Sequence, residues 1–131
     1  MTASDRSIRL LLFRLGEVRF GVLADLVAGL REIGPAEAGP DAWIHDRLGF
    51  PEAPRYRAPT AARVSRPGQP PGWVVLDAIE DLLEVGLEAV RPFPALVEPH
   101  ALRRGLWGIL PGQRPPVLLV DLCQLVERRT P

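Results

Sequence analysis

Residues 9–22, RLLLFRLGEVRFGV, decide the fold class of this chain. The run over 9–15 carries bulky apolar residues at successive positions, so both faces of a strand there would be buried. Gly16 and Glu17 follow, and 18–22 then alternates apolar residues with polar or small ones. Two apolar runs around a short glycine-containing turn predict a β-hairpin.

Further apolar runs, bounded by turn residues, extend the β prediction along the chain. They lie at 61–65, 73–76, 78–85, 107–110 and 116–120. The turns at 66–71 and 111–115 are rich in proline and glycine, and each joins two successive runs. Short strands with frequent turns are typical of a small, mostly-β barrel protein.

Helical signals are brief. Within 23–33, apolar residues at Leu23, Leu26, Val27 and Leu30 repeat every three or four positions, which predicts a short helix running into a strand. A second helix is predicted over 41–48.

Capping residues define where the predicted helices begin and end. Asp41 is the expected N-cap of the second helix, and Gly49 its expected stop. Asp121 is the expected cap of a C-terminal helix. That helix carries the apolar residues Leu122, Leu125 and Val126.

The segment 35–71 differs in composition from the rest of the chain, because it holds eight of the 15 prolines. Proline removes a backbone donor and fixes φ, so regular structure should be broken there. At this length, we expect residues 1–131 to form a single domain with an irregular segment at 35–71.

Composition and charge argue against several classes of protein. The 16 basic residues, all arginine, balance 16 acidic ones, so the chain lacks the basic excess typical of nucleic-acid binders. No apolar stretch is long enough for a membrane span or a secretory signal, so direct membrane contact is not expected. The single cysteine, Cys123, excludes an intrachain disulfide and favours a cytoplasmic location.

No residue pattern predicts catalysis, a metal or a cofactor. His45 and His100 stand alone, without metal-ligand spacing, and are expected on polar surfaces. Cys123 lies among apolar residues and is expected to be a buried small hydrophobe rather than a reactive thiolate. The densest carboxylate run is expected to be a solvated strand edge, and it comprises Asp77, Glu80, Asp81 and Glu84.

Three aromatic residues stand outside the long apolar runs: Trp73, Phe93 and Trp107. Such residues can anchor a protein interface, but barrel core is the favoured interpretation here.

The order of motifs resembles that of CheW-like adaptor domains. Residues 12–22 look like the opening hairpin of that family, and 71–79, PGWVVLDAI, is similar to its Gly-apolar-apolar-Val-Asp-x-Val segment. Residues 104–110 and 117–125 resemble its closing segments. The family's block Gly-Val-x-Asn-Leu-Arg-Gly is missing, and 35–50 stands in its place.

The resemblance implies two SH3-like five-stranded sub-barrels, one of them truncated through the divergent segment 35–71, with short helices that include a C-terminal one. It implies a non-catalytic adaptor that binds the cytoplasmic tip of a methyl-accepting chemoreceptor in a hydrophobic groove between the barrels. By position, the groove residues would be Leu11, Val22, Leu26, Val27 and Ile79, with packing in the core as the equal alternative for each of them.

The missing block faces the kinase in the family, so its loss implies weakened coupling to a CheA-type histidine kinase. Another CheW-like protein is a further implied partner. The alternative is an SH3-like peptide-binding module unrelated to chemotaxis.

Overall fold

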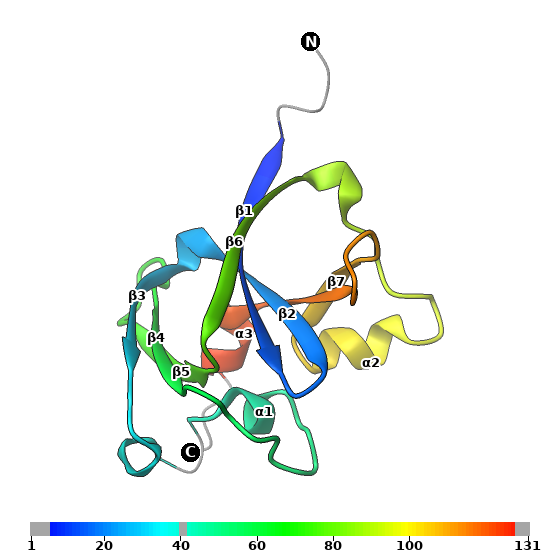
Figure 1. Ribbon diagram of the computed structural model, residues 1–131. Coiled ribbons are helices and arrows are strands. Elements are labelled where there is room, and N and C mark those ends of the chain that lie inside the picture. The colour runs from blue at the N-terminus through cyan, green and yellow to red at the C-terminus, as the bar shows by residue number, and fades with distance from the viewer. Residues whose placement is uncertain (1–5, 40–41, 128–131) are drawn as a thin grey trace.

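The computed structural model describes residues 6–39 and 42–127, which form two β-sheets and several short helices (Figure 1). The first sheet has five strands in the order β6-β1-β2-β8-β7. Its strands are β1 (Ser7–Leu15), β2 (Val18–Leu23), β6 (Ile79–Gly86), β7 (Leu106–Leu110) and β8 (Val117–Val120). Arg91, which follows β6 in the chain, pairs with Ile109 of β7 and so brings the two ends of the sheet together.

The second sheet has three strands in the order β3-β4-β5. They are β3 (Val27–Glu32), β4 (Thr60–Val64) and β5 (Gly72–Leu76), and all pairs are antiparallel. Trp43 adds an isolated parallel bridge to Val75 at the β5 edge. The predicted mostly-β fold, with one unit shortened, is therefore confirmed by sheets of five and three strands.

The helices are all short. They are η2 (Ala24–Leu26), η3 (Pro35–Glu37), α1 (Ile44–Arg47), η4 (Leu87–Ala89), α2 (Glu98–Arg103) and α3 (Leu122–Glu127). The expected helix-to-strand passage within 23–33 is η2 followed by β3.

Two capping predictions are confirmed and a third lies outside the described residues. Asp121 caps α3, since its carboxylate accepts the Gln124 N–H at 3.2 Å. Gly49 follows α1 with φ of +82°, a conformation that favours glycine. The predicted N-cap Asp41 is not among the described residues, and α1 begins at Ile44.

Two hydrophobic clusters hold the sheets together. The smaller one fills the first sheet, and its buried members are Leu10, Leu12, Leu110, Val117 and Leu119. The larger one lies between the two sheets and takes residues from both, with Phe13, Phe20 and Val22 from the first and Val64 and Val74 from the second. Strand β1 contributes to both clusters, so its two apolar faces are both buried, as its sequence predicted.

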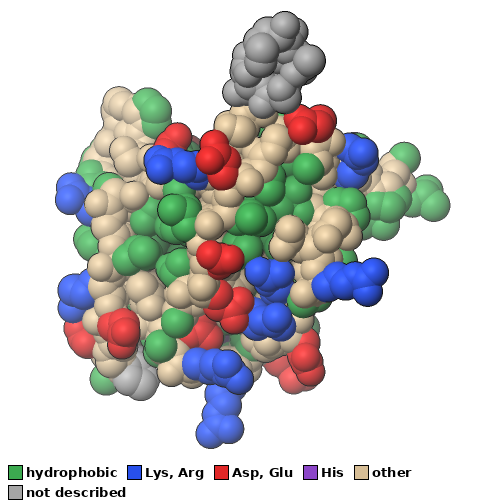
Figure 2. Space-filling model, turned by 45° about the horizontal axis from the view of Figure 1, so that its top comes forward, with side chains coloured by type: hydrophobic (Ala, Val, Ile, Leu, Met, Phe, Trp, Pro, Cys, Tyr) green, Lys and Arg blue, Asp and Glu red, His purple; other side chains and the backbone are tan. Residues whose placement is uncertain are grey.

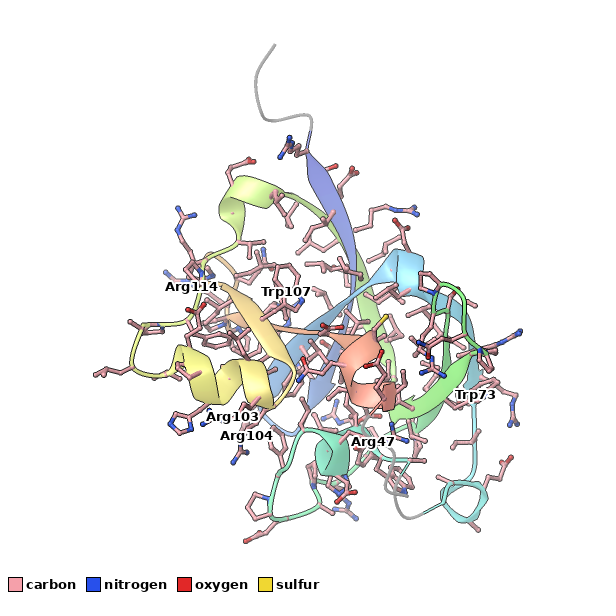
Figure 3. All side chains as sticks on the ribbon, turned by 180° about the vertical axis from the view of Figure 1, so that it is seen from behind. Arg47, Trp73, Arg103, Arg104, Trp107 and Arg114 are labelled. Carbon is pink, nitrogen blue, oxygen red and sulfur yellow. The ribbon has the colours of Figure 1, made fainter. Side chains whose placement is uncertain are left out.

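Helix α3 closes the larger cluster. Leu122, Leu125 and Val126 are buried there, and α3 packs against β4 and β5. Arg47 of α1 lies beside α3 (Figure 3) and donates from its guanidinium to the Leu125 carbonyl at 2.8 Å. This buried hydrogen bond satisfies a carbonyl in the last turn of α3.

Several sequence expectations were wrong. Helix α2 was not expected, and His100 lies in it rather than in a loop, although its side chain is exposed as expected. Pro99 is compatible with this helix because it lies in the first turn, where the backbone N–H that proline lacks would have no partner within the helix.

No helix among the described residues is long and apolar enough to cross a membrane.

Two side chains also differ from their expected surroundings. Asp77 is not on a solvated edge but only 4% exposed, whereas Glu80, Asp81 and Glu84 are exposed as predicted. Trp73 is not core, because 49% of it is exposed on β5. Trp107 is partly buried and packs against the smaller cluster.

A candidate protein-binding seam

The two sheets meet along a line whose surface we call the seam, defined by Leu11, Leu26, Val27, Ile79 and Leu82. On one side lies β6, an edge strand of the first sheet, and on the other lie η2 and β3, the edge strand of the second. Figure 2 shows hydrophobic side chains gathered in the middle of this face. The seam is therefore the place where the shared core reaches the surface.

The strand register explains how the seam is built. Leu82 of β6 pairs with Leu11 of β1, Leu11 pairs with Val22 of β2, and Val22 pairs with Val120 of β8. Paired residues on one sheet face have neighbouring side chains, so these four form one apolar row. The row is fully buried at Val22 and becomes 54% exposed at Leu82.

The second sheet supplies the opposite wall. Val27 pairs with the fully buried Val64, and both pack with the shared cluster. Leu26 precedes it in η2 and is partly buried. Ile79 lies at the start of β6, where it pairs with Phe13 and packs against the shared cluster.

The structure brings four of the five predicted groove residues to the seam. Leu11, Val27 and Ile79 are partly buried against the shared cluster, and Leu26 lines a depression next to it. Val22 is fully buried, so it supports the seam from below and presents no surface to a partner.

Leu82 is a seam residue that the sequence prediction missed. The sequence shows two adjacent leucines in β6, Leu82 and Leu83, and does not show which one faces the seam. Only the register, with its irregularity between Leu12 and Phe13, assigns Leu82 to the row of Leu11.

A depression of about 330 Å³ lies at the η2 end of the seam. Ile8, Leu23 and Leu26 give it apolar walls. Arg9 and Asp25 form an exposed ion pair at its rim, with Nη2 and Oδ1 3.2 Å apart. Such an exposed pair contributes little to stability, so contacts with a bound partner can replace it at little cost in free energy.

The surroundings of Cys123 bear on the reactivity of its thiol. Cys123 is partly exposed rather than buried, but burial and the carboxylates of Asp121 and Glu127 raise the pKa of its thiol. A raised pKa keeps the thiol protonated and unreactive at neutral pH. Within the described ranges, no group of three or more His, Cys, Asp or Glu side chains could hold a metal ion.

Comparison with solved structures shows which fold this chain has. The crystal structure of the scaffolding protein TtCheW from Thermoanaerobacter tengcongensis matches with a TM-score of 0.64 and 14% sequence identity. The match covers 86% of this chain and 88% of that one. No family model and no curated protein sequence matches the chain. The chain therefore has the fold of a CheW-type scaffolding protein, with three strands in its second sheet.

Proposed function

We propose that this protein is a non-catalytic chemosensory adaptor that holds the cytoplasmic tip of a methyl-accepting chemoreceptor in its seam. The observation that carries the proposal is the apolar row that runs from the buried Val22 through Leu11 to the exposed Leu82. The CheW-type fold and the resemblance of the sequence motifs support the same function.

The mechanism is recognition of a helix in a groove. A receptor helix offers apolar side chains at spacings of three and four residues, which can cover Leu82, Leu11 and Val27 together. Burying the exposed part of a leucine contributes about 1 kcal/mol, so each such contact strengthens binding roughly fivefold. The two sheets share one core, so the seam is already formed before the receptor binds.

We propose further that coupling to a CheA-type histidine kinase is weak or absent. In the family that the sequence resembles, the Asn-Leu-Arg-Gly block faces the kinase, and here the corresponding region is the proline-rich 35–50. The second sheet has only three strands. The adaptor would then occupy receptors, or pair with another CheW-like protein, without recruiting kinase at full strength.

The test is a binding measurement with a purified receptor tip and a kinase regulatory domain. We expect Leu82→Arg and Val27→Arg to weaken receptor binding at least tenfold, because each places a charge in the apolar contact. Leu102→Arg is the matched control, since Leu102 is an exposed leucine on α2, outside the seam. Circular dichroism verifies that all three variants are folded.

Two outcomes would contradict these proposals. Receptor binding by Leu82→Arg and Val27→Arg at wild-type strength would exclude the seam as the receptor site. Kinase binding as tight as that of a full CheW protein would exclude the weakened coupling.

A further inference from the structure

A second, larger depression of about 670 Å³ lies at the Ile79 end of β6. The residues that line it come from the end of β1 and the β1–β2 turn, from the loop before β4, and from the link between β5 and β6 with the start of β6. They are Arg14, Gly16, Glu17, Arg55, Arg57, Asp77, Ala78 and Glu80. Ala78 and Glu80 are the chain neighbours of Ile79, so the depression adjoins the seam at the start of β6. Figure 2 shows charged side chains on the same face as the central hydrophobic ones.

The loop that carries Arg55 and Arg57 is held firmly by the residue between them. The Tyr56 ring packs edge-on against Trp43, with ring centroids 4.6 Å apart. The Tyr56 hydroxyl accepts the His45 backbone N–H at 3.2 Å and lies 3.0 Å from His45 Nδ1. Tyr56 is thus tied to the start of α1, while Arg55 and Arg57 are exposed beside it.

Asp77 fixes the same loop from the other side. Its carboxylate accepts the backbone N–H groups of Arg57 at 3.0 Å, of Ala58 at 2.7 Å and of Ala78 at 2.8 Å. Charge-assisted bonds of this kind are strong, and a carboxylate with three of them has little capacity for a guanidinium. Asp77 therefore orients the loop without neutralising its arginines.

The remaining charges leave donors in excess. Glu80 is shared between Arg14, with Nε 3.2 Å from its carboxylate, and Arg19, at 4.0 Å. Arg19 Nε is buried and has no hydrogen-bond partner among the described residues. Within the same described part of the chain, the guanidiniums of Arg55 and Arg57 have no hydrogen bond or ion pair. Asp77 and Glu80 are thus engaged, whereas across the described ranges the Glu17 side chain has no hydrogen bond or ion pair, which leaves two free guanidiniums against one free carboxylate.

We propose that this depression, which we call the arginine pocket, binds an acidic side chain of the protein that occupies the seam. The proposal rests on the proposed function and adds to it the chemistry of the partner. The receptor segment would carry a glutamate or aspartate next to its apolar contact residues. Its carboxylate would pair with Arg55 and Arg57, because a guanidinium matches a carboxylate with two parallel hydrogen bonds.

A protein carboxylate fits the pocket better than a phosphate. Three carboxylates, those of Glu17, Asp77 and Glu80, already line the depression, and they repel a dianion more than a single negative charge. The pocket also adjoins the apolar seam at Ile79. One segment can therefore fill both, with its apolar side chains in the seam and its acidic one in the pocket.

The test compares receptor binding by Arg55→Ala/Arg57→Ala with that by the wild type. We expect the double variant to bind the receptor tip about tenfold more weakly and with a smaller dependence on salt, since two charge contacts are lost. The matched control is Arg63→Ala/Arg114→Ala, which removes the same charge from exposed arginines outside the pocket (Arg114, Figure 3). The control should bind as the wild type does.

A second measurement separates this proposal from the proposed function. Tetraglutamate and inorganic phosphate are titrated into the wild-type protein, and the arginine Nε–H resonances are followed by NMR. Shifts of Arg55 and Arg57 with tetraglutamate at lower concentration than with phosphate support the pocket. The same shifts without any binding of the receptor tip would refute the proposed function and still support an acidic-segment site.

Two results would overturn the arginine pocket. In the first, the double variant binds the receptor tip as tightly as the wild type. That result would show that the arginine pocket takes no part in receptor binding, and it would leave the seam as the proposed site. In the second, phosphate binds at Arg55 and Arg57 more tightly than tetraglutamate does, which makes the site one for a phosphate group.

Discussion

At the scale of single residues, His45 has the most informative surroundings. Burial lowers the pKa of its imidazole, and the carboxylate of Asp46 opposes that change only in part. The ring atom Nδ1 lies 3.0 Å from the Tyr56 hydroxyl. When Nδ1 carries no proton, it can accept the phenolic hydrogen, and a charged ring would lose that bond.

The lowered pKa of His45 makes folding stability depend on pH. The unfolded chain has the ordinary value of 6.5 and binds a proton more readily than the folded one. The contribution of neutral His45 is therefore complete above pH 6.5 and is lost as the pH falls from 6.5 towards the folded pKa. We expect the free energy of unfolding to fall between pH 7.5 and 5.5, and to fall less in His45→Gln.

Urea unfolding of both proteins at the two pH values measures this difference. An NMR titration of the imidazole Cε1–H provides the direct check, with a His45 midpoint below 6.5. An equal loss of stability in the wild type and in His45→Gln would contradict the prediction.

The surroundings of single side chains were also the feature that the sequence predicted least well. Asp77 was grouped with the exposed carboxylates of β6, because nothing in the sequence tells that distant amides of Arg57 and Ala58 converge on it. Leu82 was missed because a strand register is set by pairing between distant segments. Arg55 and Arg57 were not predicted as site residues, because their loop is placed by Tyr56 and its contacts with Trp43.

At the scale of elements, the turn between α2 and β7 lies in direct contact with α3. Gly105 in this turn has φ of +90°, which disfavours any residue with a Cβ. A Cβ at Gly105 would lie 2.8 Å from Leu125 Cδ2. The Gly105 carbonyl also accepts the Asp121 N–H at 2.8 Å, at the start of α3. The turn and the helix can therefore approach only because glycine stands here.

We expect Gly105→Ala to lower the free energy of unfolding by about 1–3 kcal/mol, because it adds backbone strain and displaces Leu125. Gly112→Ala is the matched control: Gly112 lies in the β7–β8 turn, its φ is not positive, and no atom lies within 4 Å of a Cβ there. Urea unfolding measures both variants. Equal stability of the two would show that the turn has room for a side chain.

Elements with local signals were predicted well. The β1–β2 hairpin and the strands β4, β5, β7 and β8 lie within one or two residues of their predicted bounds, and helix α3 begins directly after its predicted cap, because turn residues and caps mark these ends. Helix α2 was missed because Glu98–Arg103 is a short, largely exposed segment that contains a proline. A helix of six residues depends on its packing against β7, which the sequence does not show.

At the scale of the whole molecule, the shared core joins the two sheets, and we propose that they form one domain. Phe13 and Val22 of the first sheet lie in the same cluster as Val64 and Val74 of the second. Neither sheet can lose its fold without exposing the apolar face of the other. We therefore expect a single cooperative unfolding transition.

The tryptophans allow each sheet to be followed separately. Trp73 lies in β5 and Trp107 in β7, so two single-tryptophan variants can be made, each also carrying Trp43→Phe. In each variant, fluorescence and far-UV circular dichroism should give the same urea midpoint. A Trp73 signal that changes at lower urea than the circular dichroism would show that the second sheet unfolds alone.

The parallel pairing of β2 with β8 has a consequence for biosynthesis. Arg19 pairs with Val117, and Val22 with Val120, so the centre of the first sheet joins segments made early and late in translation. A nascent chain can form the β1–β2 hairpin soon after it leaves the ribosome, but one edge of that hairpin stays open until β8 emerges. Ribosome-bound intermediates of this protein would therefore present an unsatisfied strand edge for most of their synthesis, which is the kind of surface that chaperones shield.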